Sequence, residues 1–249
     1  MSGKKDIFRV VFAISLCFTF IFCNHLLFTQ EQNLQKENSL RGIPLIEVPA
    51  KTDSGDDLLA VILTGDGGWR KIDKEIAEAL SYWGIPVVGL NTLKYFWKRR
   101  TKEEASLTLD RIIRTYLGKW EKKRVVLVGY CFGADLLPFM ANRLPQDTLD
   151  KVLLIALLGP GHMVDFKFHP TYWLGGESGG NPQPVLPEVK KLRGKKILCF
   201  CGEAENNSLC REMESGLAKI IILPGGHHFG GNYRLIGKII HRETATFTR

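Results

Sequence analysis

The apolar run Val125–Val128, followed by Gly129-Tyr130-Cys131-Phe132-Gly133, constrains the fold of this chain more than any other feature. A β-branched run of this kind is typical of a buried strand, and Gly-x-Cys-x-Gly directly after it is the pattern of a nucleophile elbow. The glycines permit a sharp turn from strand to helix, which exposes the central side chain at the carboxyl edge of a sheet. The pattern predicts that Cys131 is a nucleophile, whereas the alternative is a free cysteine that serves as a small buried apolar residue.

A glycine-rich turn precedes the elbow in the chain, as it does in acyl-transfer enzymes of this class. The apolar run 59–63 leads into Thr64-Gly65-Asp66-Gly67-Gly68. Backbone amides in such a turn can stabilise the negative oxygen of a tetrahedral intermediate. We expect Gly65 and Asp66 to form one side of this oxyanion hole and Phe132, the residue after the nucleophile, to form the other.

The acid and the base are expected after two later apolar runs, 195–201 and 220–223. Glu205, three residues beyond the glycine that ends the first run, is the predicted orienting carboxylate, with Glu203 as the alternative. His227 directly follows a glycine pair and is the predicted general base, with His228 as the alternative. Adjacent histidines without a third ligand at helical spacing do not favour a metal site, and we expect neither a metal nor a cofactor.

These residues together predict an ester hydrolase with a Cys-His-Glu triad. His227 would take the proton of Cys131, the sulfur would attack an ester carbonyl, and Glu205 would hold the imidazole in one tautomer. The position of Cys131 at a helix N-terminus is expected to favour the thiolate. The alternative is a binding protein that keeps the scaffold of a hydrolase without turnover.

Several motifs beyond the elbow resemble the VirJ/AcvB family of bacterial virulence proteins. They lie at 64–70, 84–97, 129–145, 173–175, 199–210 and 224–229. The resemblance implies an α/β-hydrolase domain in the periplasm. Some members release the amino acid from aminoacylated phosphatidylglycerol, such as lysyl-phosphatidylglycerol, and others are tied to type IV secretion. The chain resembles the short VirJ form, because it has room for one such domain.

Two cysteine assignments follow from this resemblance. The family elbow reads Gly-Tyr-Ser-Phe-Gly, so Cys131 stands in place of a serine, and dienelactone hydrolase is a related fold that uses cysteine. The family-like disulfide pairs Cys199 with Cys210, which would close the loop that carries Glu205. The alternative is that Cys199, Cys201 and Cys210 are three buried thiols.

The chain is expected to contain three regions. Residues 1–28 combine early positive charge with the apolar stretch 10–28, which predicts a signal peptide or an uncleaved signal anchor with a cytoplasmic N-terminus. Residues 29–57 are polar and predict a tether, with one extra strand expected at 43–48. In residues 58–249, apolar runs alternate with helical patterns at 73–82, 103–120 and 135–144. This alternation predicts an α/β-hydrolase fold, a mainly parallel sheet with helices on both faces.

The net charge of +8 would also suit a nucleic-acid-binding protein, but the sequence contains no nucleic-acid-binding motif and the expected export argues against that function. A basic surface on a membrane-tethered domain suits anionic lipid headgroups. The expected partners are therefore an anionic or aminoacylated phospholipid substrate, the inner membrane and secretion-system proteins, with no nucleic acid.

Aromatic and charged residues on loops after the strands are expected to line the mouth of the site, where ligands enter open α/β sheets. The predicted substrate-binding residues are Trp69, Arg70, Tyr95 and Trp97. Asp66 or Asp135 is expected to pair with an amine of the substrate. Residues 162–187, rich in glycine, proline and aromatic residues, are expected to form a cap.

Overall fold

The structure is a computed structural model that describes residues 40–53, 57–169 and 180–245. Contacts divide the chain into two units, Met1–Arg41 and Gly42–Arg249, and the second unit carries all the elements described below. The predicted signal segment 1–28 and the motif at 173–175 lie outside the described residues. Within the ranges given above, no helix has both the length and the apolar character needed to cross a bilayer.

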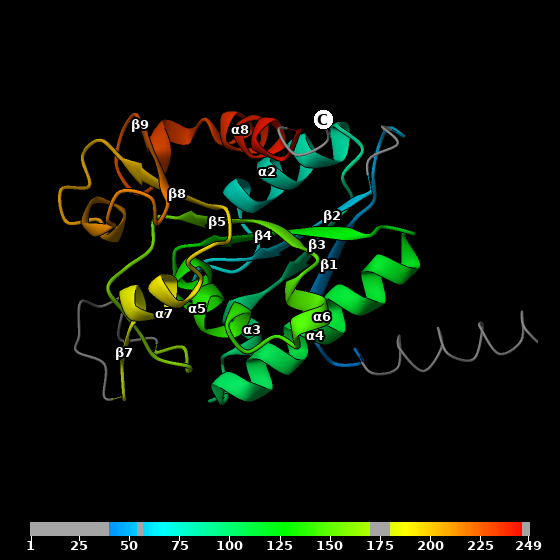
Figure 1. Ribbon diagram of the computed structural model, residues 1–249, viewed down its shortest axis with the longest axis horizontal. Helices are drawn as coiled ribbons and strands as arrows, with labels where there is room; N and C mark the ends of the chain where they lie inside the picture. Colours follow the sequence, from blue (N-terminus) through cyan, green and yellow to red (C-terminus); the bar gives the residue numbers. More distant parts are fainter. Residues whose placement is uncertain (1–39, 54–56, 170–179, 246–249) are drawn as a thin grey trace, which may run out of the picture. The chain divides into compact units, whose positions relative to one another are not determined.

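A seven-stranded sheet forms the centre of the second unit (Figure 1). In spatial order its strands are β1 (Leu45–Val48), β3 (Val87–Leu90), β2 (Leu58–Leu63), β4 (Arg124–Tyr130), β5 (Val152–Leu158), β8 (Ile197–Gly202) and β9 (Lys219–Leu223). All neighbouring pairs are parallel except β1 and β3. Two short strands, β6 (Met163–Val164) and β7 (Gln183–Pro184), pair separately and antiparallel.

Helices cover both faces of the sheet, as the alternation of strand and helix patterns predicts (Figure 1). One face carries α2 (Lys71–Tyr82) and α8 (Tyr233–Ala245). The other carries α3 (Thr92–Tyr95), α4 (Lys102–Lys119), α5 (Phe132–Ala141), α6 (Gln146–Leu149) and α7 (Val185–Lys191). Two short 3₁₀ helices, Leu209–Glu212 and Phe229–Gly231, follow β8 and β9. The mainly parallel sheet with helices on both faces is therefore confirmed.

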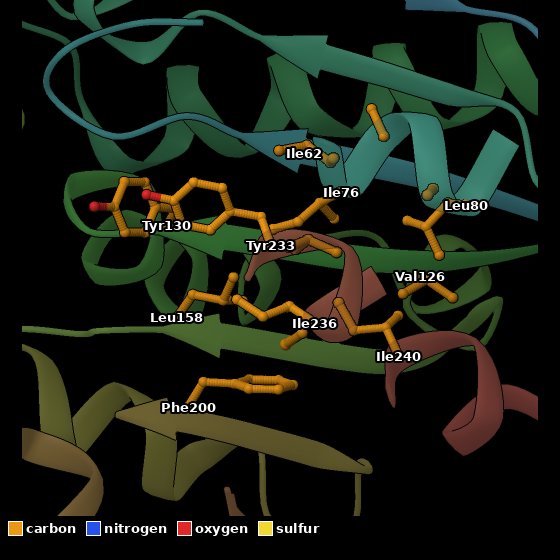
Figure 2. Close-up of a cluster of buried hydrophobic side chains, with 14 of the residues drawn as sticks. Ile62, Ile76, Leu80, Val126, Tyr130, Leu158, Phe200, Tyr233, Ile236 and Ile240 are labelled. Atoms are coloured by element: carbon orange, nitrogen blue, oxygen red, sulfur yellow. The ribbon is translucent and has the colours of Figure 1, made fainter. Parts of the chain in front are cut away.

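The core between the sheet and the α2–α8 pair is built from side chains at regular spacings (Figure 2). Alternate residues of β2, such as Ala60 and Ile62, point to this face because side chains in a strand alternate between faces. They meet Ile76 and Leu80 of α2, which are four residues apart and therefore share one face of the helix. This packing fixes the strand ends on which the loops of the site stand.

One further expected element is present, and one helix begins at a different residue from the one expected. The extra strand expected at 43–48 is present as β1, so the sheet begins before residue 58. The helix expected at 135–144 begins earlier, at Phe132, because the elbow turns directly from β4 into α5. As a result Cys131 occupies the N-cap position of α5.

Candidate active site

Cys131 lies in a tight turn between β4 and α5. Its backbone is in the positive-φ region, with φ 50° and ψ −118°, a conformation that L-residues seldom adopt and that concentrates at functional sites. Gly133 allows α5 to approach β2 closely, since a Cβ there would overlap the carbonyl oxygen of Leu63. The amide of Cys131 donates to the carbonyl oxygen of Leu158 at 2.9 Å, which holds the turn at the carboxyl end of β5.

His227 and Glu205 are joined by a hydrogen bond between the loops that follow β9 and β8. Nδ1 of His227 lies 2.7 Å from Oε1 of Glu205, and the amide of Gly202 donates to Oε2 at 2.6 Å. Both carboxylate oxygens are therefore occupied, which fixes the side chain of Glu205. With the carboxylate accepting from Nδ1–H, Nε2 of His227 is the nitrogen left to act as a base.

The acid loop is held at both ends. A disulfide joins Cys199 of β8 to Cys210, with 5.5 Å between their Cα atoms. Arg211 donates from Nε to the carbonyl oxygen of Glu205 at 2.9 Å and from Nη2 to that of Glu203 at 3.1 Å. Arg211 was not among the predicted site residues, although its position beside Cys210 places it at the base of the same loop.

His227 lies over the end of β5. Gly159 follows Leu158 there, and a Cβ at Gly159 would lie 2.7 Å from Cε1 of His227. Because Leu158 also accepts the amide of Cys131, the nucleophile and the histidine occupy adjacent parts of the same sheet edge. Within the described residues no hydrogen bond joins the sulfur to the imidazole, and such bonds commonly tighten only when substrate is bound.

Two backbone amides are directed at the sulfur of Cys131, those of Asp66 and Phe132. They come from the glycine-rich turn after β2 and from the first residue of α5, the two sides expected for an oxyanion hole. Gly65 contributes through its carbonyl oxygen, which accepts the hydroxyl of buried Thr92 at 3.1 Å and the amide of Gly68 at 3.0 Å. These bonds brace the turn and so fix the direction of the Asp66 amide.

The electrostatic environment of Cys131 differs from the expectation of a stabilised thiolate. Burial, with a further contribution from the carboxylates of Asp135 and Asp66, raises the pKa of the thiol to about 12. The amides of Phe132 and Asp66 lower the pKa but do not offset the burial. The thiol is therefore neutral in the free protein at physiological pH.

Asp135 lies one turn along α5 from Cys131, and its amide donates to the carbonyl oxygen of Cys131 at 3.1 Å. Its carboxylate accepts the amide of Gly161 at 2.6 Å. Burial raises the pKa of Asp135 well above its ordinary value. A cation bound beside this carboxylate would favour its charged form.

The alternative acid and base occupy different surroundings. Glu203 is exposed, and its amide donates to the carbonyl oxygen of Leu223 at 2.8 Å. Nδ1 of His228 lies 3.0 Å from the hydroxyl of Tyr130, a contact that could not be predicted from sequence. Of the two histidines, only His227 contacts the carboxylate of Glu205.

The four residues predicted to line the mouth differ in their surroundings, although Tyr95 and Trp97 both line one hollow. The ring of Trp69 packs against Gly89 of β3, and Arg70 is exposed at the N-cap of α2. Tyr95 is buried, with its hydroxyl 2.6 Å from that of Thr108, so it packs inside the domain. Trp97 is 58% exposed.

The sheet order, the elbow and the loops at its carboxyl edge define an α/β-hydrolase fold. Solved structures share this fold. Est1E from Butyrivibrio proteoclasticus, solved with ferulic acid bound, is 13% identical in sequence with a TM-score of 0.56, and the match covers 83% of this chain and 96% of that one. MenH from S. aureus is 13% identical with TM-score 0.58, over 81% and 98% of the two chains. The esterase domain of a Rhodothermus marinus protein is 15% identical with TM-score 0.53, over 80% and 89%.

The sequence places the chain more narrowly within this fold. Residues 57–246 match the family described as bacterial virulence protein (VirJ), and the chain belongs to that family. Among curated protein sequences, none matches significantly.

Proposed function

We propose that this protein is an ester hydrolase in which Cys131 is the nucleophile, His227 the general base and Glu205 the residue that orients the base. The observation that carries the proposal is the arrangement at one sheet edge of the elbow cysteine, two amides directed at its sulfur and a hydrogen-bonded His227–Glu205 pair. These are the groups that acyl transfer requires, namely a nucleophile, a base and an oxyanion hole.

The reaction would proceed in two halves. In the first, His227 accepts the thiol proton as the sulfur attacks the ester carbonyl, and the amides of Asp66 and Phe132 stabilise the oxyanion. The intermediate collapses to a thioester, and the leaving alkoxide takes the proton from the imidazolium. In the second half, His227 removes a proton from water, which attacks the thioester; the intermediate collapses to the carboxylic acid, and the departing sulfur takes the proton back from the imidazolium to regenerate the thiol.

The proposed substrate is an aminoacyl ester of phosphatidylglycerol, such as lysyl-phosphatidylglycerol, at the periplasmic face of the inner membrane. The resemblance to the VirJ/AcvB family motivates this choice. The site supports it because Asp66 and Asp135 both lie close enough to Cys131 to raise the pKa of its thiol. The carboxylate of Asp66, and that of Asp135 in the charged form that a bound cation favours, suit the ammonium group that an aminoacyl ester carries next to the reacting carbonyl.

One observation favours a second candidate, a non-catalytic periplasmic binding protein of a secretion system. The raised pKa of Cys131 makes the free thiol a poor nucleophile. On this account the elbow is retained as a scaffold and the sheet edge binds a partner protein.

The test uses the full chain in a nonionic detergent, incubated with lysyl-phosphatidylglycerol and separately with an aryl ester. Release of lysine or of the phenol is followed for the wild type and for Cys131→Ser, Cys131→Ala and His227→Ala. Cys201→Ser is the matched control, because Cys201 is the other free cysteine among the described residues and is buried in β8. Turnover that is lost in Cys131→Ala and His227→Ala but kept in Cys201→Ser supports the hydrolase. A wild type that stays silent while Cys131→Ser turns over would favour the binding protein.

A further inference from the structure

A cavity of about 400 Å³ lies beside the loop that leads into α4, and its lining is mainly cationic. It contains the charged residues Arg99, Arg100, Lys102, Arg143, Glu103 and Asp165. Four cations and two carboxylates line the hollow, and even with Glu188, which also pairs with Arg143, positive charge remains in excess. Such an excess attracts an anion.

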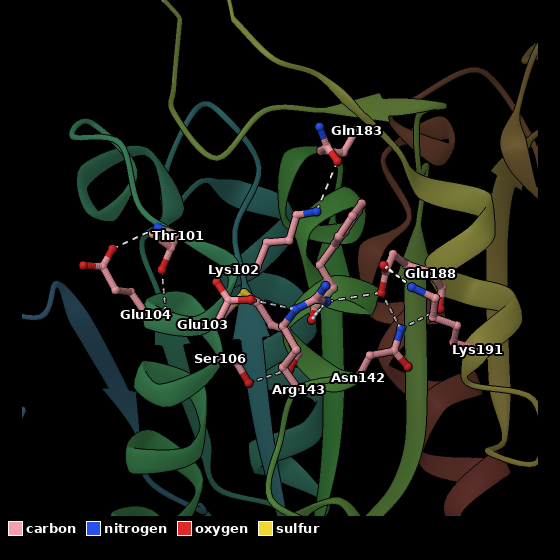
Figure 3. A network of polar contacts seen from close by, with 12 residues as sticks. Thr101, Lys102, Glu103, Glu104, Ser106, Asn142, Arg143, Gln183, Glu188 and Lys191 are labelled. Atoms are coloured by element: carbon pink, nitrogen blue, oxygen red, sulfur yellow. Dashed lines mark hydrogen bonds and ion pairs between the residues drawn. The ribbon is translucent and has the colours of Figure 1, made fainter.

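Two of the cations already have carboxylate partners. Arg99 donates to both oxygens of Asp165, which is buried, and the bond from Nη2 measures 2.7 Å. Arg143 bridges Glu103 and Glu188, at 3.3 Å from each (Figure 3). These pairs shape the cavity and leave Arg100 and Lys102 to supply the excess charge.

Lys102 has no carboxylate partner in the described part of the chain. Its ammonium group donates to the side-chain oxygen of Gln183 at 3.1 Å (Figure 3) and lies 5.1 Å from the centre of the Phe139 ring. An ammonium group has three N–H donors, and here it contacts one neutral acceptor and one aromatic ring. It can therefore still donate a hydrogen bond to an anion.

Arg100 also lines the cavity and has an incomplete set of hydrogen-bond partners. Its guanidinium carbon lies 5.0 Å above the ring of Tyr95, and its Nε is buried without a hydrogen-bond partner among the described residues. Buried polar groups of folded proteins are nearly always paired, and leaving one unpaired is costly, more so when it is charged. Arg100 also lines a neighbouring hollow of about 460 Å³, together with Lys98 and the exposed Trp97.

We propose that this cavity is a phosphate-binding site, in which Arg100 and Lys102 contact the oxygens of a phosphate group. A phosphate group, whether a diester, a monoester or the free ion, is an anion with several oxygens that can accept hydrogen bonds from both side chains. A guanidinium and an ammonium group are the two side-chain donors that phosphates prefer. The phosphate belongs either to a lipid headgroup, as a diester, or to a small soluble molecule.

The site is separate from the proposed catalytic residues. Phe166, on the cavity wall, contacts Phe96, and Phe96 contacts Phe132 at 5.7 Å between ring centres. Aromatic rings therefore stand between the cavity and the elbow. The phosphate site does not rest on the proposed hydrolase function and can be tested whether or not Cys131 supports turnover.

The experiment is isothermal titration calorimetry of the full chain in a nonionic detergent at constant ionic strength. The two probes are inorganic phosphate and glycerophosphoglycerol, the soluble headgroup of phosphatidylglycerol. We expect saturable binding that weakens at least about tenfold in Arg100→Gln and in Lys102→Gln, because each variant removes a charge-assisted hydrogen bond. Tighter binding of the diester identifies a lipid headgroup as the source, and tighter binding of inorganic phosphate identifies a soluble one.

Lys238→Gln is the matched control, since it makes the same change of charge on exposed Lys238 of α8, outside the cavity. Its binding is expected to equal that of the wild type. The absence of saturable binding for both probes, or an equal loss in Lys238→Gln, would overturn the proposal. Circular dichroism checks that each variant is folded. If Arg100→Gln does not fold, Lys102→Gln decides the outcome, because Lys102 is partly exposed.

Discussion

The raised pKa of Cys131 predicts that this thiol is slow to alkylate and that its rate keeps rising over the whole accessible pH range. Burial and the neighbouring carboxylates raise the pKa from the ordinary 9.0 to about 12. A shift of about three units lowers the thiolate fraction near pH 7.5 roughly a thousandfold, while the more basic thiolate gains about twentyfold in nucleophilicity. The net expectation is alkylation about fiftyfold slower than that of an ordinary exposed cysteine.

Iodoacetamide and peptide mass spectrometry measure this rate at Cys131 without interference from the other cysteines. Between pH 6 and 10 the rate is expected to rise about tenfold per pH unit, because only the thiolate reacts and its fraction stays small. Asp135→Asn and Asp66→Asn each remove a carboxyl group whose charged form raises the pKa of the thiol. Both variants should therefore alkylate faster than the wild type at pH 8.

A rate that reaches a plateau with a midpoint below about pH 8 would refute this reasoning. It would mean that the helix N-terminus and His227 stabilise the thiolate more than burial destabilises it. Unchanged rates in both aspartate variants would separately refute the contribution assigned to the two carboxylates.

Three further predictions concern the support of the site. Gly159→Ala should lower kcat/KM for the aryl ester by about a hundredfold or more, because the new Cβ would displace the ring of His227. Gly194 also has a positive φ but has open space around it, so Gly194→Ala should leave kcat/KM unchanged. Burial raises the pKa of Asp73 from 3.8 to about 6, so the protonated side chain favours the folded state. Urea unfolding should show a stability contribution of up to about 3 kcal/mol that is present below pH 4 and is lost as the pH rises through 6. This pH dependence should be absent in Asp73→Asn. Cys210→Ser removes the disulfide to Cys199, which spans a sequence separation of 11, and should lower the free energy of unfolding by about 3 kcal/mol. The kcat should also fall, because the acid loop is held less firmly. Equal stability of variant and wild type would contradict this prediction.

The fold could be predicted from sequence because it depends on local patterns. Buried parallel strands read as continuous apolar runs, and the chain order of the elbow, the acid and the histidine points to Cys131, Glu205 and His227. Strand ends in a parallel sheet meet at one edge, so the sequence alone was enough to expect these residues near one another.

The rest depends on packing between distant segments and could not be predicted in this way. Tyr95 follows a strand like a residue of the mouth, yet its hydroxyl meets Thr108 of α4 inside the domain. The helix N-terminus at Cys131 is visible in the sequence, but the burial that outweighs it is not. The unpartnered Nε of Arg100 depends on which groups surround it in three dimensions.

The two carboxylates beside Cys131 lead to a link between substrate recognition and the generation of the nucleophile. Asp66 and Asp135 raise the pKa of the thiol, so an ammonium group bound beside them would cancel that effect and make the proton easier to transfer to His227. An alanyl aryl ester should therefore exceed its N-acetyl analogue in kcat, as well as bind more tightly, and Asp66→Asn should reduce the ratio of the two kcat values. A preference that appears only in KM would mean that the acids bind the amine but that the bound amine does not lower the pKa of Cys131. His227 and Glu205 alone would then have to offset the effect of burial on the thiol.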